Sequence, residues 1–393
     1  MTSEERREAR YQRRKQRREQ KRRESLRDAN DFEKVIGYRA LFDATQKCRR
    51  GVYWKDSVKS YYCYALLNNP ILHTRQEKGL SCHRKTNHFT ITERGHLRHI
   101  QSHKFSERVL QTALNENALA PMLNRSLIYD NGASQKGKGT YFAADRLEDA
   151  LHRYYDLHGN NRGYIMLLDF HNYFGSIVKA QCLDDLQKVC EDPRLFKAMR
   201  QEIEPDGPVG LGLGSPMHQT LAIHYTNDVD HKMDNTPGIE GVGVYMDDRH
   251  AIASTRQILI DAAKAAAPLW QARGIELNLD KSKIVPIWKP FKFCQTRYVL
   301  TETGAVLRLP VHKKTSAERR KLKKQRRLWD EGKITDPESI RGGYLGWRAN
   351  YEKKNARRTV RMTDGLYNKL FVIPKITRPI NGGKKHEHRV YHR

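Results

Sequence analysis

The sequence has few cysteines and no long apolar run, and both features exclude certain classes of protein. The six cysteines are scattered and form no Cys-x-x-Cys pair, which argues against a zinc module or a disulfide scaffold. No apolar stretch approaches the roughly 18 residues needed to cross a bilayer. The basic N-terminus also lacks the apolar core of a secretory signal. The sequence therefore predicts a reduced, cytoplasmic chain with no membrane partner.

Acidic residues are scarce relative to basic ones. The chain has 393 residues, with 73 Lys and Arg against 45 Asp and Glu, and a net charge of +28. Such a charge needs counter-charge, for which nucleic acid is the usual source and an anionic membrane surface the second. The length suggests roughly two or three domains.

The charge is distributed unevenly along the chain. Residues 1–27 carry +7, residues 28–150 carry +6, residues 151–250 carry −6 and residues 281–393 carry +21. Basic surfaces bind phosphates, and a carboxylate cluster binds divalent cations. An acidic middle in a basic chain therefore favours a metal-dependent enzyme that acts on nucleic acid.

Apolar periodicity predicts a mixed chain of helices and strands. The run Tyr-Ile-Met-Leu-Leu at 164–168 predicts a buried strand that ends at Asp169. Segments 239–244 and 251–253 predict two strands around the turn Tyr245-Met246-Asp247-Asp248. We further expect a hairpin at 88–100, helices at 106–123 and 257–273, a strand at 291–300, and basic helices beyond 313 with breaks at Asp336-Pro337 and Gly342-Gly343.

Three carboxylates stand out as candidate catalytic groups. Adjacent aspartates on a regular strand point to opposite faces, but Asp247 and Asp248 at a tight turn can converge and share metals with Asp169. Two divalent cations roughly 3.5–4 Å apart can activate a primer 3′-hydroxyl and stabilise the leaving pyrophosphate. Mg²⁺ prefers such oxygen ligands. The second pair, Asp184-Asp185, is interpreted as an exposed helix start.

Four ordered segments resemble motifs A to D of the reverse transcriptase palm. They are Leu-Leu-Asp-Phe-His-Asn-Tyr-Phe at 167–174, Gly-Leu-Gly-Leu-Gly-Ser-Pro at 210–216, Tyr-Met-Asp-Asp at 245–248, and Gly-Ile-Glu-Leu-Asn-Leu-Asp-Lys at 274–281. Segments 93–98, 106–109 and 131–139 resemble the fingers motifs and the loop before the palm in bacterial and phage reverse transcriptases. The resemblance covers roughly residues 90–300.

The resemblance implies an RNA-directed DNA polymerase with an α+β, right-hand fold. Its parts would be a basic N-terminal arm (1–30), fingers (31–160), a ferredoxin-like antiparallel palm (161–290), a helical thumb (291–380) and a basic tail (381–393). The arm is interpreted as a helix that orders on RNA or DNA or, alternatively, as a basic tail that aids solubility.

The resemblance also implies roles for individual residues. The carboxylates of Asp169, Asp247 and Asp248 and the carbonyl of Phe170 would hold two Mg²⁺ ions, with Mn²⁺ as a substitute. Lys281 would donate a proton to pyrophosphate, or else is a surface lysine. The dNTP would contact Arg98, Arg108, Phe174, Gly214 and Ser215. Primer and template would contact Tyr245, Lys136, Lys138, Arg319, Arg320, Lys323 and Lys324. Phe174 would exclude a 2′-hydroxyl; the alternative is a core aromatic.

Some residues depart from the family pattern and leave alternatives open. Leu213 stands where motif B often has Gln, and 214–219 resembles diversity-generating retroelements only in part, because His218 departs. The sequence leaves open whether the enzyme belongs to a retroelement, a prophage or an antiphage-defence system. The expected partners are a template RNA, a primer or cDNA, a cognate non-coding RNA and an accessory protein. An RNA-templated RNA polymerase and a non-catalytic RNA-binding protein are the rivals. Phe174 argues against the first and the Asp triad against the second.

Cys82 and His83, together with His73 and His88, are residue types that can bind zinc. The spacing of these four residues fits no common zinc site.

Overall fold

The computed structural model describes residues 3–84, 86–93, 96–334 and 336–371. The chain divides into two compact units, one of residues 1–294 with 300–306 and one of residues 295–299 with 307–393. The segments expected to form the fingers and the palm both belong to the first unit. The expected basic tail at 381–393 and the turn at 94–95 lie outside the described residues.

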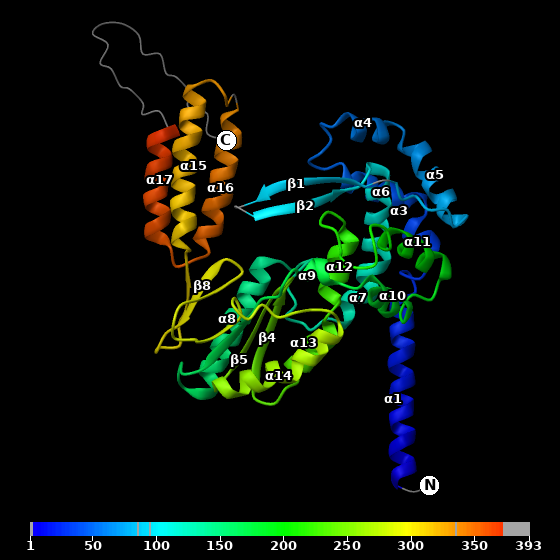
Figure 1. The fold of residues 1–393 in the computed structure, drawn as a ribbon, viewed down its shortest axis with the longest axis horizontal. Helices are drawn as coiled ribbons and strands as arrows, with labels where there is room; N and C mark the ends of the chain where they lie inside the picture. The colour runs from blue at the N-terminus through cyan, green and yellow to red at the C-terminus, as the bar shows by residue number, and fades with distance from the viewer. Residues whose placement is uncertain (1–2, 85, 94–95, 335, 372–393) are drawn as a thin grey trace, which may run out of the picture. The chain divides into compact units, whose positions relative to one another are not determined.

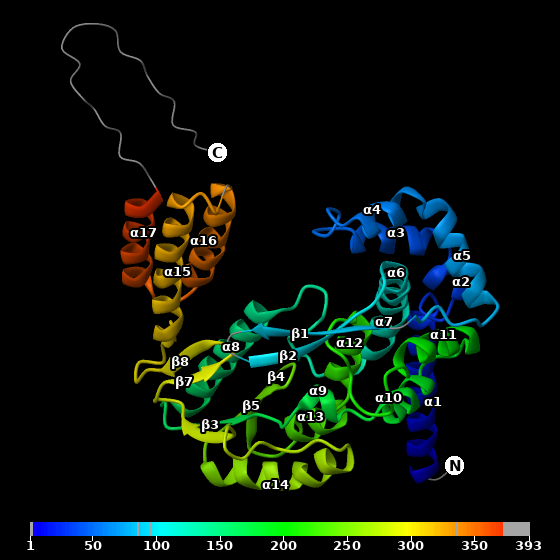
Figure 2. The same cartoon turned by 45° about the horizontal axis from the view of Figure 1, so that its top comes forward.

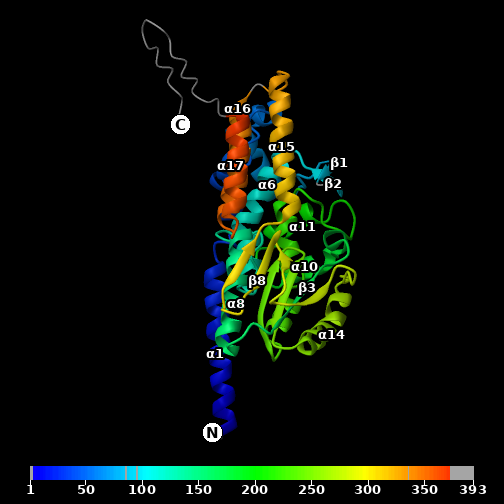
Figure 3. The same cartoon turned by 90° about the vertical axis from the view of Figure 1, so that its left-hand side faces the viewer.

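The chain begins with a long exposed helix, α1 (Ser3–Leu26). It is rich in Glu, Arg, Gln and Lys, which are good helix formers. Among the described residues of α1, only Leu26 is buried, so apolar packing holds the helix at its C-terminal end alone. Figures 1 and 3 show α1 extending away from the rest of its unit, with the N-terminus at the far end.

Helices and one hairpin make up most of the region before residue 160. The elements are α2 (Phe32–Ile36), α3 (Tyr38–Cys48), α4 (Asp56–Cys63), α5 (Ala65–Glu77), β1 (Asn87–Glu93), β2 (His96–Ser102), α6 (Phe105–Leu114), α7 (Ala120–Leu123) and α8 (Thr140–His158). Strands β1 and β2 pair as the expected antiparallel hairpin. The helix expected at 106–123 is interrupted by a π-helical turn at Asn115–Leu119. Pro121 lies just beyond this turn and has no N–H to donate to the helix.

A four-stranded antiparallel sheet forms the centre of the first unit. Its strands are β3 (Tyr164–Leu168), β4 (Ile239–Tyr245), β5 (Asp248–Ala253) and β6 (Lys283–Pro286), in the spatial order β4-β5-β3-β6. Helices α9 (Tyr173–Ser176), α10 (Lys179–Gln187), α11 (Pro193–Ile203), α12 (Pro216–His224) and α13 (Asn227–Asp234) connect β3 to β4, and α14 (Arg256–Ala272) connects β5 to β6. The expected α+β class is confirmed at this level, and so is the strand ending at Asp169.

The two faces of this sheet have different surroundings. Residues on one face pack with α13 and α14 in one apolar core, which includes Met166, Leu168, Val242, Val244, Ala251, Ala253, Val229, Leu259 and Trp270. Figure 2 shows α14 lying along this side of the sheet. Because side chains alternate along a strand, the residues between them, such as Asp248 and His250, belong to the opposite face.

The expectation that the second pair of aspartates starts a helix is wrong. Asp184 and Asp185 lie in the second half of α10, where Asp184 is exposed and Asp185 pairs with Lys188 and Arg273. Helix α10 begins earlier because Lys179, Cys182 and Leu183 are buried.

The chain passes from the first unit to the second through a small sheet of β7 (Phe291–Phe293), β8 (Thr296–Leu300) and β9 (Val306–Leu309). The single strand expected at 291–300 is therefore two strands. Cys294 and Gln295 between them both have positive φ angles, +42° and +63°. Two such residues form the tight turn that matches the twist of a hairpin.

The described part of the second unit contains three helices, α15 (His312–Asp330), α16 (Pro337–Glu352) and α17 (Arg357–Phe371). The break at Asp336-Pro337 is confirmed, since Asp336 caps α16. The break at Gly342-Gly343 is wrong, because both glycines lie inside α16. Each costs roughly 1 kcal/mol in a helix, and packing offsets this cost: Ile340, Tyr344 and Tyr351 are buried, and the Tyr344 ring stacks on Tyr367 at 4.3 Å.

In the part of the chain that the structure describes, no helix combines the length and the apolar character needed to span a membrane.

Candidate active site

Asp247 and Asp248 lie at a two-residue hairpin turn between β4 and β5. Tyr245 pairs with Asp248, so Met246 and Asp247 form the turn. Met246 has a φ of +57°, an unusual backbone conformation for a residue with a side chain. Tyr245 and Met246 pack against Leu127, Ala133 and Ile223, which holds them in place. The turn therefore presents Asp247 to solvent and leaves Asp248 half-buried at the start of β5.

Asp169 lies across the sheet from Asp248. Leu168, the last residue of β3, pairs with Arg249 in the antiparallel ladder, so the next position along brings Asp169 opposite Asp248. Opposite residues share a face, with Cα atoms about 4.5–5.5 Å apart. The strand register thus brings together carboxylates that are about 80 residues apart in the sequence.

The electrostatics of Asp248 reflect this crowding. Burial, followed by the negative charges of Asp247 and Asp169, raises the pKa of its carboxyl to about 6, against opposing effects of Lys292 and Arg249. The cluster therefore holds more negative charge than the fold itself neutralises, which is the condition for attracting a cation.

The segment that resembles motif D is bonded directly to Asp169. The backbone N–H of Asn278 donates to the Asp169 carbonyl (2.9 Å), and the Asp169 N–H donates to Ser282 Oγ (3.1 Å). Lys281 Nζ lies 3.6 Å from Asp169 Oδ2, with 70% of its side chain exposed. Phe170 forms a bridge with Leu277 in the same segment. Lys281 is thus held beside the carboxylates while remaining open to solvent.

Arg249 is a supporting residue that reasoning from the sequence missed. It follows Asp248 but belongs to the helix-covered face, where its side chain is 2% exposed. Its guanidinium donates to Asp230 Oδ1 (2.8 Å), the Met246 carbonyl (3.3 Å), the Tyr173 hydroxyl (3.4 Å) and Thr226 Oγ1. It therefore ties the turn to α13 and to Tyr173. An arginine near the start of a strand that continues as Ala-Ile-Ala was the available signal.

The segment that resembles motif B packs beside Phe174. Phe174 is half-buried against the core, and its carbonyl accepts a hydrogen bond from Leu211 N–H (2.8 Å). Leu213 accepts another from Gln101 in β2 (3.1 Å). Gly214 has a φ of +137°, and a Cβ there would lie 2.4 Å from the Gln101 carbonyl oxygen. Gly214 is therefore required by close backbone packing as well as by any contact with substrate.

The remaining residues expected to contact the dNTP are Arg98, Arg108 and Ser215. The backbone of Arg98 lies in β2, but its side chain is outside the described part of the structure. Arg108 is exposed on α6. Ser215 is buried, and among the described residues its hydroxyl has no hydrogen-bond partner.

The two lysines of the glycine-rich loop differ from each other. Lys136 is exposed. Lys138 Nζ donates to the carbonyls of Tyr129 (2.7 Å) and Asn131 (3.1 Å), and burial lowers its pKa. The ammonium group of Lys138 thus stabilises the loop itself.

The expected thumb contacts all lie on α15 in the second unit. Arg320, Lys323 and Lys324 are exposed. Arg319 is partly buried and donates from Nε to Thr363 Oγ1 on α17 (3.4 Å). Three of the four residues are therefore available to contact phosphate, and Arg319 also packs within the helical unit.

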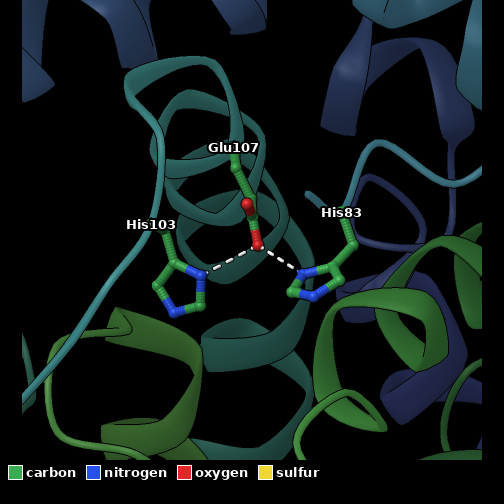
Figure 4. Close-up of side chains that lie close together, drawn as sticks. All are labelled: His83, His103 and Glu107. Carbon is green, nitrogen blue, oxygen red and sulfur yellow. Dashed lines mark hydrogen bonds and ion pairs between the residues drawn. The ribbon is translucent and has the colours of Figure 1, made fainter. Parts of the chain in front are cut away.

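A separate group of His83, His103 and Glu107 could hold a metal ion (Figure 4). Both histidines place Nδ1 beside the same Glu107 oxygen, at 2.7 and 2.8 Å. Two N–H donors on one carboxylate account for this geometry without an ion. Burial would raise the pKa of Glu107, but these hydrogen bonds hold it below its usual value. Of the residues considered for zinc, only His83 belongs to the group; His73, for example, bonds Glu33.

Within the described residues this is the one group of His, Cys, Asp or Glu side chains whose ligand atoms gather within 4.8 Å. The three aspartates are more widely spread. Carboxylates repel one another when no cation lies between them.

Glu202 extends the Glu107 network and makes stability depend on pH. Its Oε2 accepts from Gln111 (3.0 Å), and burial, followed by the charge of Glu107, raises its pKa to about 8. The unfolded value is about 4.3, so the folded state binds the extra proton and stability falls as pH rises from about 4.3 to 8. Glu202→Gln mimics the neutral acid. Its stability advantage should grow by roughly 1–3 kcal/mol between pH 5 and pH 8, measured by urea unfolding.

Glu204→Gln provides the matched control, because Glu204 is exposed and pairs only with Arg200 among the described residues. A Glu202→Gln variant with the pH dependence of the wild type would contradict the assignment of a neutral, buried Glu202.

Compared with known proteins, the chain matches no protein-family model and no curated sequence. Its function must therefore be inferred from the residues of the site.

Proposed function

We propose that this chain is an RNA-directed DNA polymerase that adds dNTPs to a primer 3′ end. The observation that carries the proposal is the register that sets Asp169 opposite Asp248, with Asp247 in the adjoining turn. The βαββαβ order of the sheet agrees with a ferredoxin-like polymerase palm. The helical region with its hairpin would serve as fingers and the three-helix unit as thumb.

The carboxylates of this cluster fit Mg²⁺, with Mn²⁺ as a substitute. They offer hard oxygen ligands, and the pKa of Asp248 is raised by burial and then by the neighbouring charges of Asp247 and Asp169. Bound divalent cations would supply activation of the primer hydroxyl and neutralisation of the leaving pyrophosphate. Asp169, Asp247 and Asp248 would hold them.

The chain's own residues would position the reactants. Lys281 beside Asp169 is suited to deliver a proton to the departing pyrophosphate. Phe174, bonded through its backbone to the motif B segment, would pack against the sugar of the incoming nucleotide. Exposed cations on α15 would contact the backbone phosphates of template and primer.

Primer extension tests the proposal directly. The full-length protein should extend oligo(dT) on poly(rA) with dTTP and Mg²⁺, and chelation of the metal should stop the reaction. Absence of incorporation by the folded protein on several RNA and DNA templates would reject the proposal. Sequencing the RNA that co-purifies with the protein would identify a cognate template and show whether it comes from a retroelement, a prophage or a defence locus.

Phe174→Ala should admit ribonucleotides. Removing the ring opens space for a 2′-hydroxyl, and one small group in an apolar pocket is worth roughly 10–200-fold in discrimination. The preference for dNTP over rNTP should fall by about that factor in competition assays. Phe196→Ala on α11 is the control, since Phe196 is also half-buried against the core. Unchanged sugar selectivity would refute this role of Phe174, and strong rNTP use by the wild type would favour an RNA polymerase.

A further inference from the structure

Helix α1 carries a concentrated positive surface that the candidate active site does not use. Eight of its cations, which we call the cationic stripe, are Arg6, Arg7, Arg10, Arg13, Arg14, Arg17, Arg18 and Lys21. All eight are exposed. Successive residues of an α-helix are turned by about 100°, so these positions fall within a sector of about 140°. The stripe therefore occupies one side of the helix.

The stripe consists of two parallel rows. Arg6, Arg10, Arg13 and Arg17 form the first row, and Arg7, Arg14, Arg18 and Lys21 form the second. The rows are turned from each other by roughly 80°, and fifteen residue steps of about 1.5 Å give a length of about 22 Å. Each row repeats at intervals of three, four or seven residues, as positions on one helix face do.

Most of the acidic residues lie on the other side of α1. Glu8 accepts a hydrogen bond from Gln12 (2.6 Å), and Glu19 pairs with Arg22 and Arg23. These partners all lie outside the stripe. Glu24 follows the end of the first row and bonds Gln20. Among the described residues, no ion pair within the chain neutralises any of the eight stripe cations.

We propose that the cationic stripe binds a duplex segment of RNA. The proposal rests on the proposed function, which makes RNA a partner of this chain. Two rows of cations match the two rows of phosphates that border a groove. In A-form RNA the major groove is too narrow and deep for side chains to read the bases. The stripe would therefore contact the phosphates on both edges of this groove, without regard to sequence.

A membrane surface fits α1 less well than RNA does. Helices that lie on membranes need a broad apolar face beside their basic one. The apolar side chains of α1 are only Ala9, Tyr11 and Leu26, of which Leu26 is buried in the fold. The side opposite the stripe carries glutamates, glutamines and the cations Lys15, Arg22 and Arg23. Such a polar face would not enter a bilayer.

Neutralising the stripe should weaken RNA binding and its dependence on salt. We suggest the variant Arg10→Gln, Arg13→Gln, Arg14→Gln, Arg17→Gln in the full-length protein, with a labelled 20-base-pair RNA hairpin followed by fluorescence anisotropy. The plot of log affinity against log salt has a negative slope, and each lost phosphate contact reduces the magnitude of this slope by about 0.9. The slope should therefore fall by about 3 to 4, and affinity at 150 mM KCl should fall tenfold or more.

A rearranged variant provides the matched control. The changes Gln12→Arg, Arg13→Gln, Gln16→Arg and Arg17→Gln keep the composition and net charge and move two cations off the stripe. The slope should fall by about 2. Wild-type binding by this variant, with helicity unchanged by circular dichroism, would show that only total charge matters and would overturn the proposal.

The remaining outcomes separate this proposal from the polymerase itself. If the wild type extends primers but stripe variants bind RNA normally, only the stripe assignment fails. If the wild type extends no primer while stripe variants lose RNA binding, the stripe stands and the polymerase proposal fails. Tighter binding of a DNA duplex of the same sequence would overturn the choice of RNA. Loss of binding to phosphatidylserine vesicles with RNA binding intact would assign the stripe to membranes.

Discussion

Asp248→Asn and Asp169→Asn should each reduce templated dNTP incorporation by roughly 10³-fold. A metal ion contributes several kcal/mol of charge stabilisation to phosphoryl transfer, and each 1.36 kcal/mol corresponds to a factor of ten. Asp169, which directly follows β3, lies opposite Asp248 at the start of β5, so the loss of either carboxylate leaves an incomplete ligand set. The fold should survive, because Asn has nearly the same shape and the substitution relieves repulsion at a crowded carboxylate.

Asp184→Asn is the matched control for these variants. Asp184 also belongs to an Asp-Asp pair, but it is exposed on α10 and away from the sheet. It should extend primers at the wild-type rate. A second readout is the stabilisation of the protein by Mg²⁺, since a ligand that binds only the folded state raises the melting temperature. The wild type and Asp184→Asn should show this rise, whereas Asp248→Asn should not.

Primer extension by Asp248→Asn at the wild-type rate would remove the basis of the proposed mechanism. Biological function that persists when Asp247 and Asp248 are both changed to Ala would instead favour a non-catalytic, RNA-binding role.

Arg249→Met should destabilise the protein by about 3–5 kcal/mol, the cost of leaving one member of a buried ion pair without its partner. Asp230 is 1% exposed and Arg249 is 2% exposed. Without the guanidinium, Asp230 keeps a buried charge, and the Met246 carbonyl loses a donor. Urea unfolding with a linear extrapolation measures the loss.

Two comparisons test whether burial causes this effect. Arg273→Met also removes an arginine that forms ion pairs. Arg273 pairs with Asp185 and Asp228, but at a partly exposed position. It should cost no more than about 1 kcal/mol. The double variant Asp230→Leu, Arg249→Met replaces the buried pair by apolar groups and should recover much of the stability. If Arg249→Met costs no more than Arg273→Met, the buried pair does not support the turn.

The double variant also separates stability from positioning. Arg249 donates to the Met246 carbonyl inside the turn that carries Asp247. We therefore expect the double variant to fold well and yet to extend primers more slowly than the wild type. Equal rates would mean that Arg249 acts on stability alone.

The local sequence pattern was sufficient to predict the strands and the turn that carry the aspartates. The apolar run at 164–168 became β3 because its residues are largely aliphatic and four of the five are buried, which suits a central strand. The glycine- and valine-rich segment before Tyr245 and the apolar one after Asp248 became a hairpin with Met246 and Asp247 at its turn. The periodicity of α14 and the Asp-Pro start of α16 are likewise local signals.

Other features depended on contacts that form only in the folded chain. Gly342-Gly343 continued a helix because aromatic packing with α17 outweighed the weak propensity of glycine. Lys138, expected to contact nucleic acid, instead bonds the carbonyls of Tyr129 and Asn131, which are nearby in the sequence but come within reach only through the folding of the loop. No sequence period encodes either outcome.

The sequence by itself determined the excess positive charge, the acidic middle segment, the strand that ends at Asp169 and the turn that holds Asp247 and Asp248, because each depends on residues close together in the chain. Only the tertiary structure decided that β3 pairs with β5 in the register that sets Asp169 opposite Asp248. It likewise decided that Arg249 is buried on Asp230 beneath them. Both arrangements arise from the burial of apolar surface between distant segments, and that burial depends on the whole fold.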